Sequence, residues 1–126
     1  MARALEAIQS TKRSPRAGRS RSFKLRQFLG IAQEDFARLL GVSVRSVARW
    51  EGKGGRPVPD VREKINFLMK LSMLLDEMIE REDITDWLTT PNPEFLDQPP
   101  VDLIRSEYGR RIIEQEIKRA EWGIPG

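Results

Sequence analysis

The sequence contains neither cysteine nor histidine among its 126 residues. Their absence excludes disulfides, thiolate chemistry, the usual zinc sites and general-base catalysis by histidine. A long apolar run is also missing, because the longest one, from Phe67 to Leu75, is interrupted by Lys70 and Ser72 and is shorter than the roughly 20 residues that span a bilayer. We therefore expect no metal site, no cofactor and no membrane-spanning segment.

Acidic residues are scarce in the first half of the chain. Residues 1–22 hold six basic residues and one acidic residue, residues 23–59 hold seven and three, and residues 60–126 hold nine and fifteen. A basic region of this kind suits a polyanionic partner such as DNA. Residues 1–21 are rich in Arg and Ser and poor in apolar side chains, so burial cannot offset the entropy cost of ordering them. We predict a disordered basic arm over residues 1–21.

The stretch from Gln33 to Gly52 predicts a helix-turn-helix, in which two short helices are joined by a tight turn. Its central Gly41 can take the left-handed conformation that ends the first helix, and Ser43 can cap the second. The second helix is expected from about Val44 to Glu51. A further helix over residues 23–29 precedes the motif, because its apolar residues recur at core spacing.

The second helix of this motif has an inward and an outward face. We expect Val47 and Ala48 to point into the core. Arg45, Ser46 and Arg49 fall on the opposite face, where basic and small polar side chains can meet base edges in a DNA groove. The alternative interpretation is an ordinary amphipathic hairpin of helices with a solvated, charged face.

The spacing of Gln33, Ala37, Gly41 and Val47 resembles the repressor-type helix-turn-helix domains of the Xre (Cro-like) family. The resemblance implies that the second helix reads DNA bases and that the small side chain of Ala37 lets the two helices cross closely. The chain departs from the family pattern at Ala32, where a Ser or Thr cap usually stands.

By this resemblance, Gln33 contacts a DNA phosphate and Arg26 forms a structural ion pair with Glu51. The base-reading positions are Val44, Arg45 and Arg49. The cations that follow the second helix can hold phosphates, although a solvated linker is an equally good interpretation of them. The expected DNA-binding residues are Gln33, Ser43, Val44, Arg45, Ser46, Arg49, Lys53 and Arg56.

A long helix follows, which Asp60 can cap and which we expect to run from residue 60 to about Arg81. Its apolar residues cover more than half of its circumference, which is more than one small bundle can hide. We therefore predict a connecting helix that also packs against a second copy of the chain. The residues expected in the core or in this dimer contact are Leu68, Leu71, Leu75 and Met78.

The last part of the chain predicts a small module of helices. A short helix ends before Pro91, a proline-rich turn leads to a helix at Val101, and Ser106 caps a final helix that ends near Trp122. The order and spacing of this run resemble the Xre/MbcA/ParS toxin-binding domain. The matching residues are Trp87, Leu88, Thr90, Pro91, Asn92, Pro93, Pro100, Asp102, Leu103, Ile104, Gly109, Trp122, Gly123 and Ile124.

This second resemblance implies an antitoxin whose partner is a toxin of the RES type, an enzyme that consumes NAD. The last residues would approach the substrate cleft of the toxin and block NAD entry, because an exposed aromatic beside apolar neighbours can fill a pocket. These residues are Trp122, Gly123, Ile124 and Pro125. The alternative for Trp122 is that it covers the core of its own module. The chain lacks the glycine that the family usually has shortly before Pro100.

We predict an all-α protein with an Xre/Cro-like helix-turn-helix bundle over residues 22–59, a connecting and dimerisation helix over residues 60–81 and a toxin-binding module over residues 82–126. The predicted protein is a cytoplasmic, nucleoid-associated bacterial antitoxin that neutralises its toxin and, as a homodimer, represses its own operon by binding operator DNA. The alternative is a stand-alone Xre-family regulator whose C-terminal module serves only dimerisation. An enzyme that uses Asp83 and Asp86 is disfavoured, because no base, metal ligand or phosphate-binding loop accompanies them.

Overall fold

The computed structural model describes residues 21–52 and 54–122, with side chains as far as Ala120. Within these ranges the regular structure is helical, apart from an isolated bridge between Asn92 and Gln98. The all-α expectation is therefore confirmed. The chain divides into two compact units, one that ends at Ile84 and one that begins at Thr85. None of the helices described is long and apolar enough to cross a membrane.

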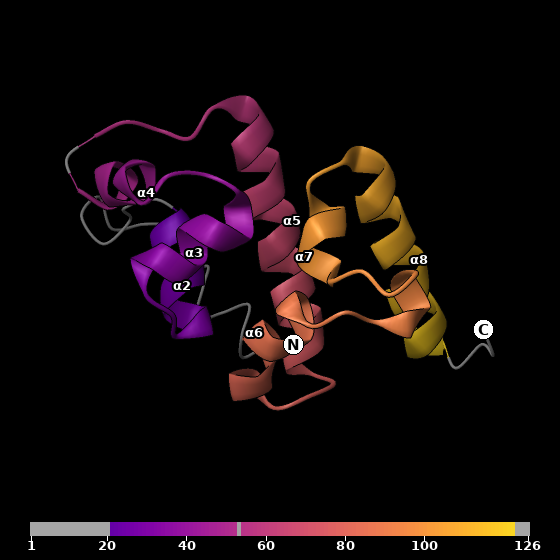
Figure 1. Ribbon diagram of the computed structural model, residues 1–126. Coiled ribbons are helices and arrows are strands. Elements are labelled where there is room, and N and C mark those ends of the chain that lie inside the picture. Colours follow the sequence, from indigo (N-terminus) through magenta and orange to yellow (C-terminus); the bar gives the residue numbers. More distant parts are fainter. Residues whose placement is uncertain (1–20, 53, 123–126) are drawn as a thin grey trace. The chain divides into compact units, whose positions relative to one another are not determined.

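The first unit is built from helices that pack around the start of a long one. Its described elements are α2 (Arg21–Leu29), α3 (Gln33–Leu40), α4 (Val44–Glu51), α5 (Pro59–Asp76) and the short 3-10 helix η2 (Arg81–Asp83). α2 contacts both α4 and α5, and α3 contacts α4 (Figure 1). Leu25, Phe36, Leu40 and Val47 are almost completely buried, so apolar residues from α2, α3 and α4 form the core of this unit.

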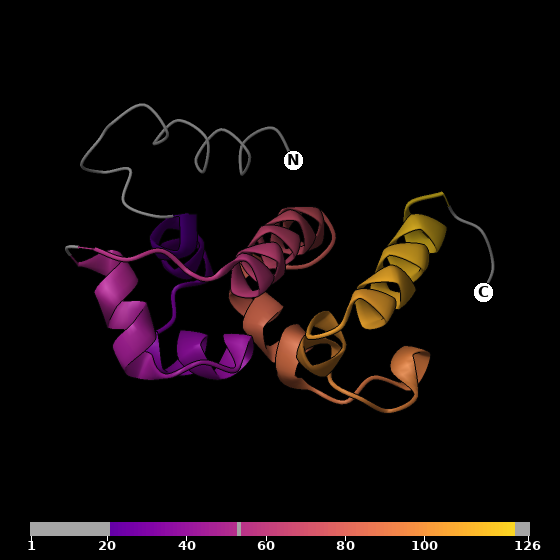
Figure 2. The ribbon, with the colours of Figure 1, turned by 90° about the horizontal axis from the view of Figure 1, so that it is seen from above.

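The turn between α3 and α4 has the geometry that the sequence predicted. Gly41 has a φ of 72° and a ψ of 36°, a left-handed conformation that glycine adopts without steric cost. The Ser43 hydroxyl caps α4 by accepting a hydrogen bond of 3.1 Å from the backbone N–H of Ser46. The side chain of Ala32 makes no such bond at the start of α3. Figure 2 shows α3 and α4 meeting at a steep angle across this turn.

The inward face of α4 differs from the expected one. Val47 is fully buried, as predicted, but Ala48 is exposed and Trp50 is the second buried residue of the helix. In a helix, positions i and i+3 lie on the same face, so the stripe that starts at Val47 continues at Trp50. The expectation that Ala48 points into the core was therefore wrong.

Both ends of α5 also differ from the expectation. Pro59 takes the first helical position, for which its fixed φ is suited, and Val58 rather than Asp60 stands at the N-cap. The helix ends at Asp76 and not near Arg81. After this end the chain turns back, and Arg81 forms an ion pair with Asp76, with Nε 3.0 Å from Oδ1.

The apolar residues that we expected in the core or in a dimer contact fall into two groups. Leu68, Leu71 and Leu75 are at most 2% exposed, so they already belong to the core of the single chain. Met78 lies beyond the end of α5 and is 46% exposed. A dimer contact through this region stays a prediction, for which Met78 offers exposed apolar surface and the three leucines do not.

The second unit is a set of short helices followed by a longer one. Its elements are α6 (Ile84–Thr89), whose first residue belongs to the first unit, η3 (Pro93–Phe95), α7 (Pro100–Ile104) and α8 (Glu107–Trp122). Ser106 caps α8 as predicted, because its hydroxyl accepts a hydrogen bond of 2.9 Å from the backbone N–H of Gly109. The side chains of Leu88, Phe95, Ile104 and Ile113 are almost completely buried.

Close packing of α7 against α8 depends on Gly109. This glycine is buried, and a Cβ atom at its position would lie 2.0 Å from the carbonyl oxygen of Leu103. No side chain fits there without a shift of the backbone. Arg110 adds a second connection, since its Nη1 donates a hydrogen bond of 2.8 Å to the carbonyl oxygen of Ile104.

Candidate functional site

The outward face of α4 is the candidate surface for DNA. Val44 is 42% exposed, Arg45 and Arg49 are exposed, and Ser46 is half-buried. Buried Val47 on the opposite side holds the helix against the core of the first unit. Among the described residues, the arrangement presents one short, basic and exposed helical face, and a DNA major groove is wide enough to admit an α-helix.

The two arginines on this face have different surroundings. A Cβ atom at Gly55 would lie 3.0 Å from the Arg49 Nε, so the side chain of Arg49 lies close over the backbone of the segment that follows α4. Gly55 has a φ of 86°, which favours glycine there for a second reason. Arg45 lies in the first turn of α4, two residues after the Ser43 cap.

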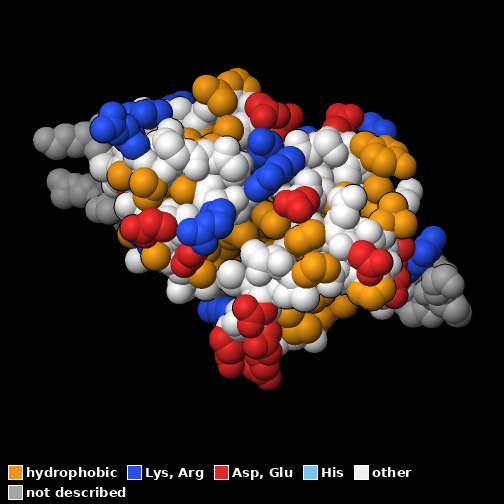
Figure 3. Space-filling view, in the orientation of Figure 1, with side chains coloured by type: hydrophobic (Ala, Val, Ile, Leu, Met, Phe, Trp, Pro, Cys, Tyr) orange, Lys and Arg blue, Asp and Glu red, His pale blue; other side chains and the backbone are white. Residues whose placement is uncertain are grey.

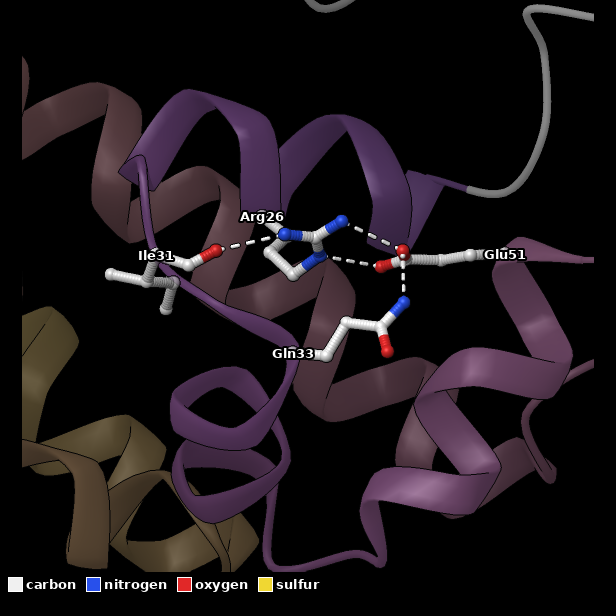
Figure 4. Close-up of polar contacts among 4 residues, drawn as sticks. All are labelled: Arg26, Ile31, Gln33 and Glu51. Atoms are coloured by element: carbon white, nitrogen blue, oxygen red, sulfur yellow. Dashed lines mark hydrogen bonds and ion pairs between the residues drawn. The ribbon is translucent and has the colours of Figure 1, made fainter.

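A charged network fixes α4 to the helices beneath it (Figure 4). Arg26 of α2 binds both carboxylate oxygens of Glu51, with Nε 2.6 Å from Oε2 and Nη2 2.8 Å from Oε1. Arg26 also donates from Nη1 to the carbonyl oxygen of Ile31, and Gln33 donates from Nε2 to Glu51 Oε1 at 2.8 Å. Three helices of the unit, α2, α3 and α4, therefore meet at one carboxylate.

Burial makes this network stiff. The side chains of Arg26 and Glu51 are only 19% and 7% exposed. The hydrogen bond to Glu51, and then its negative charge, raise the pKa of Arg26 further than partial desolvation lowers it. Arg26 consequently stays charged, and its bidentate geometry fixes the direction of the end of α4. The contact of Gln33 with Glu51 was not anticipated, because the family resemblance implied only a phosphate contact for Gln33.

Additional cations lie near the end of α4. A hollow of about 610 Å³ in the first unit is lined by Arg21, Arg56 and Arg62, together with Trp50 and Asn66 among others. Sequence reasoning identified Arg56 but missed Arg21 and Arg62, which come from different helices, α2 and α5, that contact each other. Lys53 lies outside the described residues.

Charge is unevenly distributed over the first unit. In the view of Figure 3, basic side chains gather over α4 and the segment after it, whereas acidic side chains gather around η2. A basic surface of this kind would attract a polyanionic partner more strongly than the acidic surface around η2 would.

Most of the residues expected to block the toxin lie outside the part of the chain that the structure describes. Gly123, Ile124 and Pro125 lie outside the described residues, and Trp122 is described only as the last backbone position of α8. Two other apolar side chains of the second unit are exposed: Leu96, at 83%, and Tyr108, at 73%. Neither was singled out from the sequence.

Comparison of the sequence with known proteins shows the family of the chain. Residues 74–123 match the family described as the antitoxin Xre/MbcA/ParS C-terminal toxin-binding domain. The chain is 31% identical over 88 residues to the mycobacterial cidal antitoxin MbcA of Mycobacterium tuberculosis and to that of Mycobacterium bovis, an alignment covering 68% of this chain and 75% of each relative. The chain belongs to the MbcA family of antitoxins.

A solved structure supports the same assignment for this antitoxin. The crystal structure of the M. tuberculosis MbcT–MbcA toxin–antitoxin complex contains a chain that matches it with a TM-score of 0.64 and 25% sequence identity. The match covers 83% of this antitoxin and 94% of that chain. A match of this length extends beyond residues 74–123, so the likeness is not confined to the C-terminal domain. The resemblance to Xre/MbcA/ParS antitoxins read from the sequence is confirmed.

Proposed function

We propose that this antitoxin neutralises a cognate toxin by direct binding and represses its own operon by binding operator DNA. The first unit would bind the DNA and the second the toxin. The toxin would be of the RES type, an enzyme that consumes NAD, as the motif resemblance of the C-terminal run implies. The protein itself would carry no catalytic role.

The observation that carries the DNA half of the proposal is the exposed face of α4 above its charged support. Arg45 and Arg49 are exposed on the outward side, while Val47 is buried on the inner side. Arginine commonly pairs with guanine through two hydrogen bonds, and such pairs discriminate against other bases. The network around Glu51 supports this function because it limits movement of α4 during reading.

Phosphate contacts would position this helix on the duplex. Gln33 at the start of α3 and Arg56 after α4 flank the reading helix in sequence, and Arg21 and Arg62 add positive charge beside Arg56. Such contacts give affinity and register but carry no sequence information. Lys53 is proposed as a further phosphate contact from its place in the sequence.

The active form on DNA would be a homodimer. Helix-turn-helix dimers read two half-sites that are separated by one helical turn or a multiple of it, so operator symmetry mirrors protein symmetry. We propose that the segment after α5, including the exposed Met78, contributes to the dimer contact.

The toxin half of the proposal is supported by the relatives. The matched family is described as a toxin-binding domain, and the matched solved structure is a toxin–antitoxin complex. By this likeness the second unit would bind the toxin, and Trp122 with the three residues after it would enter the toxin's substrate cleft and prevent NAD from binding. The proposed contact combines a large aromatic with apolar neighbours, as interface anchors do.

The DNA half can be tested by fluorescence anisotropy with a duplex from the promoter of the antitoxin's own operon at physiological salt. Arg45→Ala and Arg49→Ala should each weaken binding by about tenfold or more, because each removes a base contact. Arg111→Ala is the matched control: it removes one exposed arginine from α8 and should change the affinity by no more than about twofold. Unchanged affinity in both α4 variants would overturn the assignment of the reading helix.

The toxin half can be tested with the product of the adjacent gene. The full-length antitoxin should form a stable complex with it and inhibit its consumption of NAD. Deletion of residues 122–126 should abolish this inhibition, because the proposed blocking residues are gone. Full inhibition by the shortened antitoxin would show that the tail is not the blocking element, and absence of any complex with the full chain would contradict the proposed function itself.

A further inference from the structure

The second unit contains a short loop that is tightly closed on itself. The backbone N–H of Asn92 donates to the carbonyl oxygen of Gln98, and the carbonyl oxygen of Asn92 accepts from the N–H groups of Phe95 and Asp97 at 2.9 and 3.0 Å. The Asn92 side chain accepts a further hydrogen bond from the N–H of Glu94. One residue thus ties together most of the loop, which leaves its tip little freedom to move.

Phe95 anchors this loop to the unit. Its side chain is 3% exposed and meets the ring of Trp87 edge to face, with 6.0 Å between ring centroids and an angle of 87° between the planes. η3, which ends at Phe95, also contacts α8. The residue after Phe95 is therefore presented from a rigid base.

That residue is Leu96, and its conformation and exposure both oppose stability. Leu96 has a φ of 58° and a ψ of 37°, in the left-handed region that is unfavourable for a branched side chain, and Asp97 follows with a φ of 61°. The Leu96 side chain is 83% exposed, so it gains almost nothing from the core. Glycine or asparagine would make the same turn with less strain. Since neither folding nor solubility favours leucine here, its value lies in a contact with another molecule.

We propose that Leu96 is a toxin-contact residue that inserts as a preformed apolar knob into an apolar pocket of the cognate toxin. This proposal rests on the proposed function of the second unit as the toxin-binding unit. The loop lies within residues 74–123, the part of the chain that matches the toxin-binding family. A rigid loop loses little conformational entropy on binding, so an exposed leucine at its tip contributes efficiently to affinity. The contact is separate from the C-terminal tail and would help to select one toxin over another.

The experiment measures affinity of full-length antitoxin for the purified product of the adjacent gene by isothermal titration calorimetry. Leu96→Gly removes the side chain and suits the left-handed turn, so the thermal unfolding midpoint should stay the same or rise. The dissociation constant should increase by about tenfold or more. Leu96→Asn should behave in the same way, whereas Leu96→Met keeps an apolar knob and should retain most of the affinity.

A control variant and the possible negative results distinguish failure of the proposed role of Leu96 from failure of the proposed function. Val58→Ala shortens another exposed apolar side chain, in the first unit, and should leave toxin affinity within about twofold of the wild type. If Leu96→Gly binds the toxin as tightly as the wild type, the role of Leu96 is disproved while the proposed function stands. If Leu96→Gly instead lowers the dimer fraction in sedimentation and leaves toxin affinity unchanged, the residue contacts a second copy of the chain and the proposal is wrong. Failure of the wild type to bind overturns both proposals.

Discussion

The two units of this antitoxin bring their helices together in different ways. In the first unit α2, α3 and α4 are joined by side chains that meet at Glu51, and the turn at Gly41 supplies the angle between α3 and α4. In the second unit α7 and α8 approach until the backbone of Leu103 fills the space that a side chain at Gly109 would need. In the first unit, several polar contacts therefore fix the positions of the helices. In the second unit, the close packing of α7 and α8 depends heavily on the absence of a side chain at Gly109.

The largest expected effect comes from filling that space. Gly109→Ala places a methyl group against the Leu103 carbonyl and should lower the free energy of unfolding by about 3 kcal/mol, measured by urea denaturation. Gly54→Ala is the matched control, because a Cβ atom there meets nothing within 4 Å, and it should change stability by less than about 0.5 kcal/mol. We expect toxin affinity to fall further than DNA affinity. Equal losses of toxin affinity and DNA affinity would show that the substitution in the second unit also disturbs the first unit.

A smaller loss of stability is expected when the ion pair between Arg26 and Glu51 in the first unit is removed. Arg26→Met removes the cation that binds both oxygens of the Glu51 carboxylate, which is 7% exposed, and should cost about 2 kcal/mol in urea denaturation, less than for fully buried pairs. Arg38→Met removes the partner of Asp35 in an exposed pair and should cost at most about 0.5 kcal/mol. Similar costs for the two variants would mean that the network at Glu51 does not hold the helices in place.

The smallest expected loss of stability comes from removing the N-caps of α4 and α8. Ser43→Ala and Ser106→Ala each remove a hydroxyl that accepts a backbone N–H at a helix start, and each should reduce the free energy of unfolding by about 1 kcal/mol. Ser43→Thr and Ser106→Thr keep the acceptor and should recover most of that loss. A clear difference between the Ser43 and Ser106 variants would indicate that one helix start is held by tertiary packing more than by its cap.

The helix-turn-helix was predictable because its determinants are local. A glycine that must adopt a positive φ and a serine that caps the next helix lie three residues or fewer from the turn they specify. The placement of Ala48 failed because Ala48 directly follows Val47 and so lies about 100° round the helix, whereas Trp50, three residues after Val47, shares its inward face. The start of α5 was misplaced because Pro59 competes with Asp60 for the first turn.

Two further features, the end of α5 and the turn at Leu96, were not predicted from the sequence pattern. The end of α5 was expected too late because apolar residues continue through Met78 and Ile79, while the turn that ends it brings Arg81 back onto Asp76 and over the Phe28 ring at 4.2 Å. Leu96 was missed because leucine is disfavoured in a left-handed turn. The family usually has a glycine shortly before Pro100, where this chain has Asp97-Gln98-Pro99, and the structure shows that Leu96 and Asp97 take the positive φ values there.

The sharing of Glu51 by two donors has a consequence for docking. Its Oε1 accepts one hydrogen bond from Arg26 and another from Gln33, but only Arg26 neutralises the carboxylate, because the Gln33 amide carries no charge. A Gln33 side chain that swings away to meet a phosphate would leave both bonds of Arg26 intact. Engagement with the duplex would then exchange one hydrogen bond for another, and the joint between the three helices would not have to open.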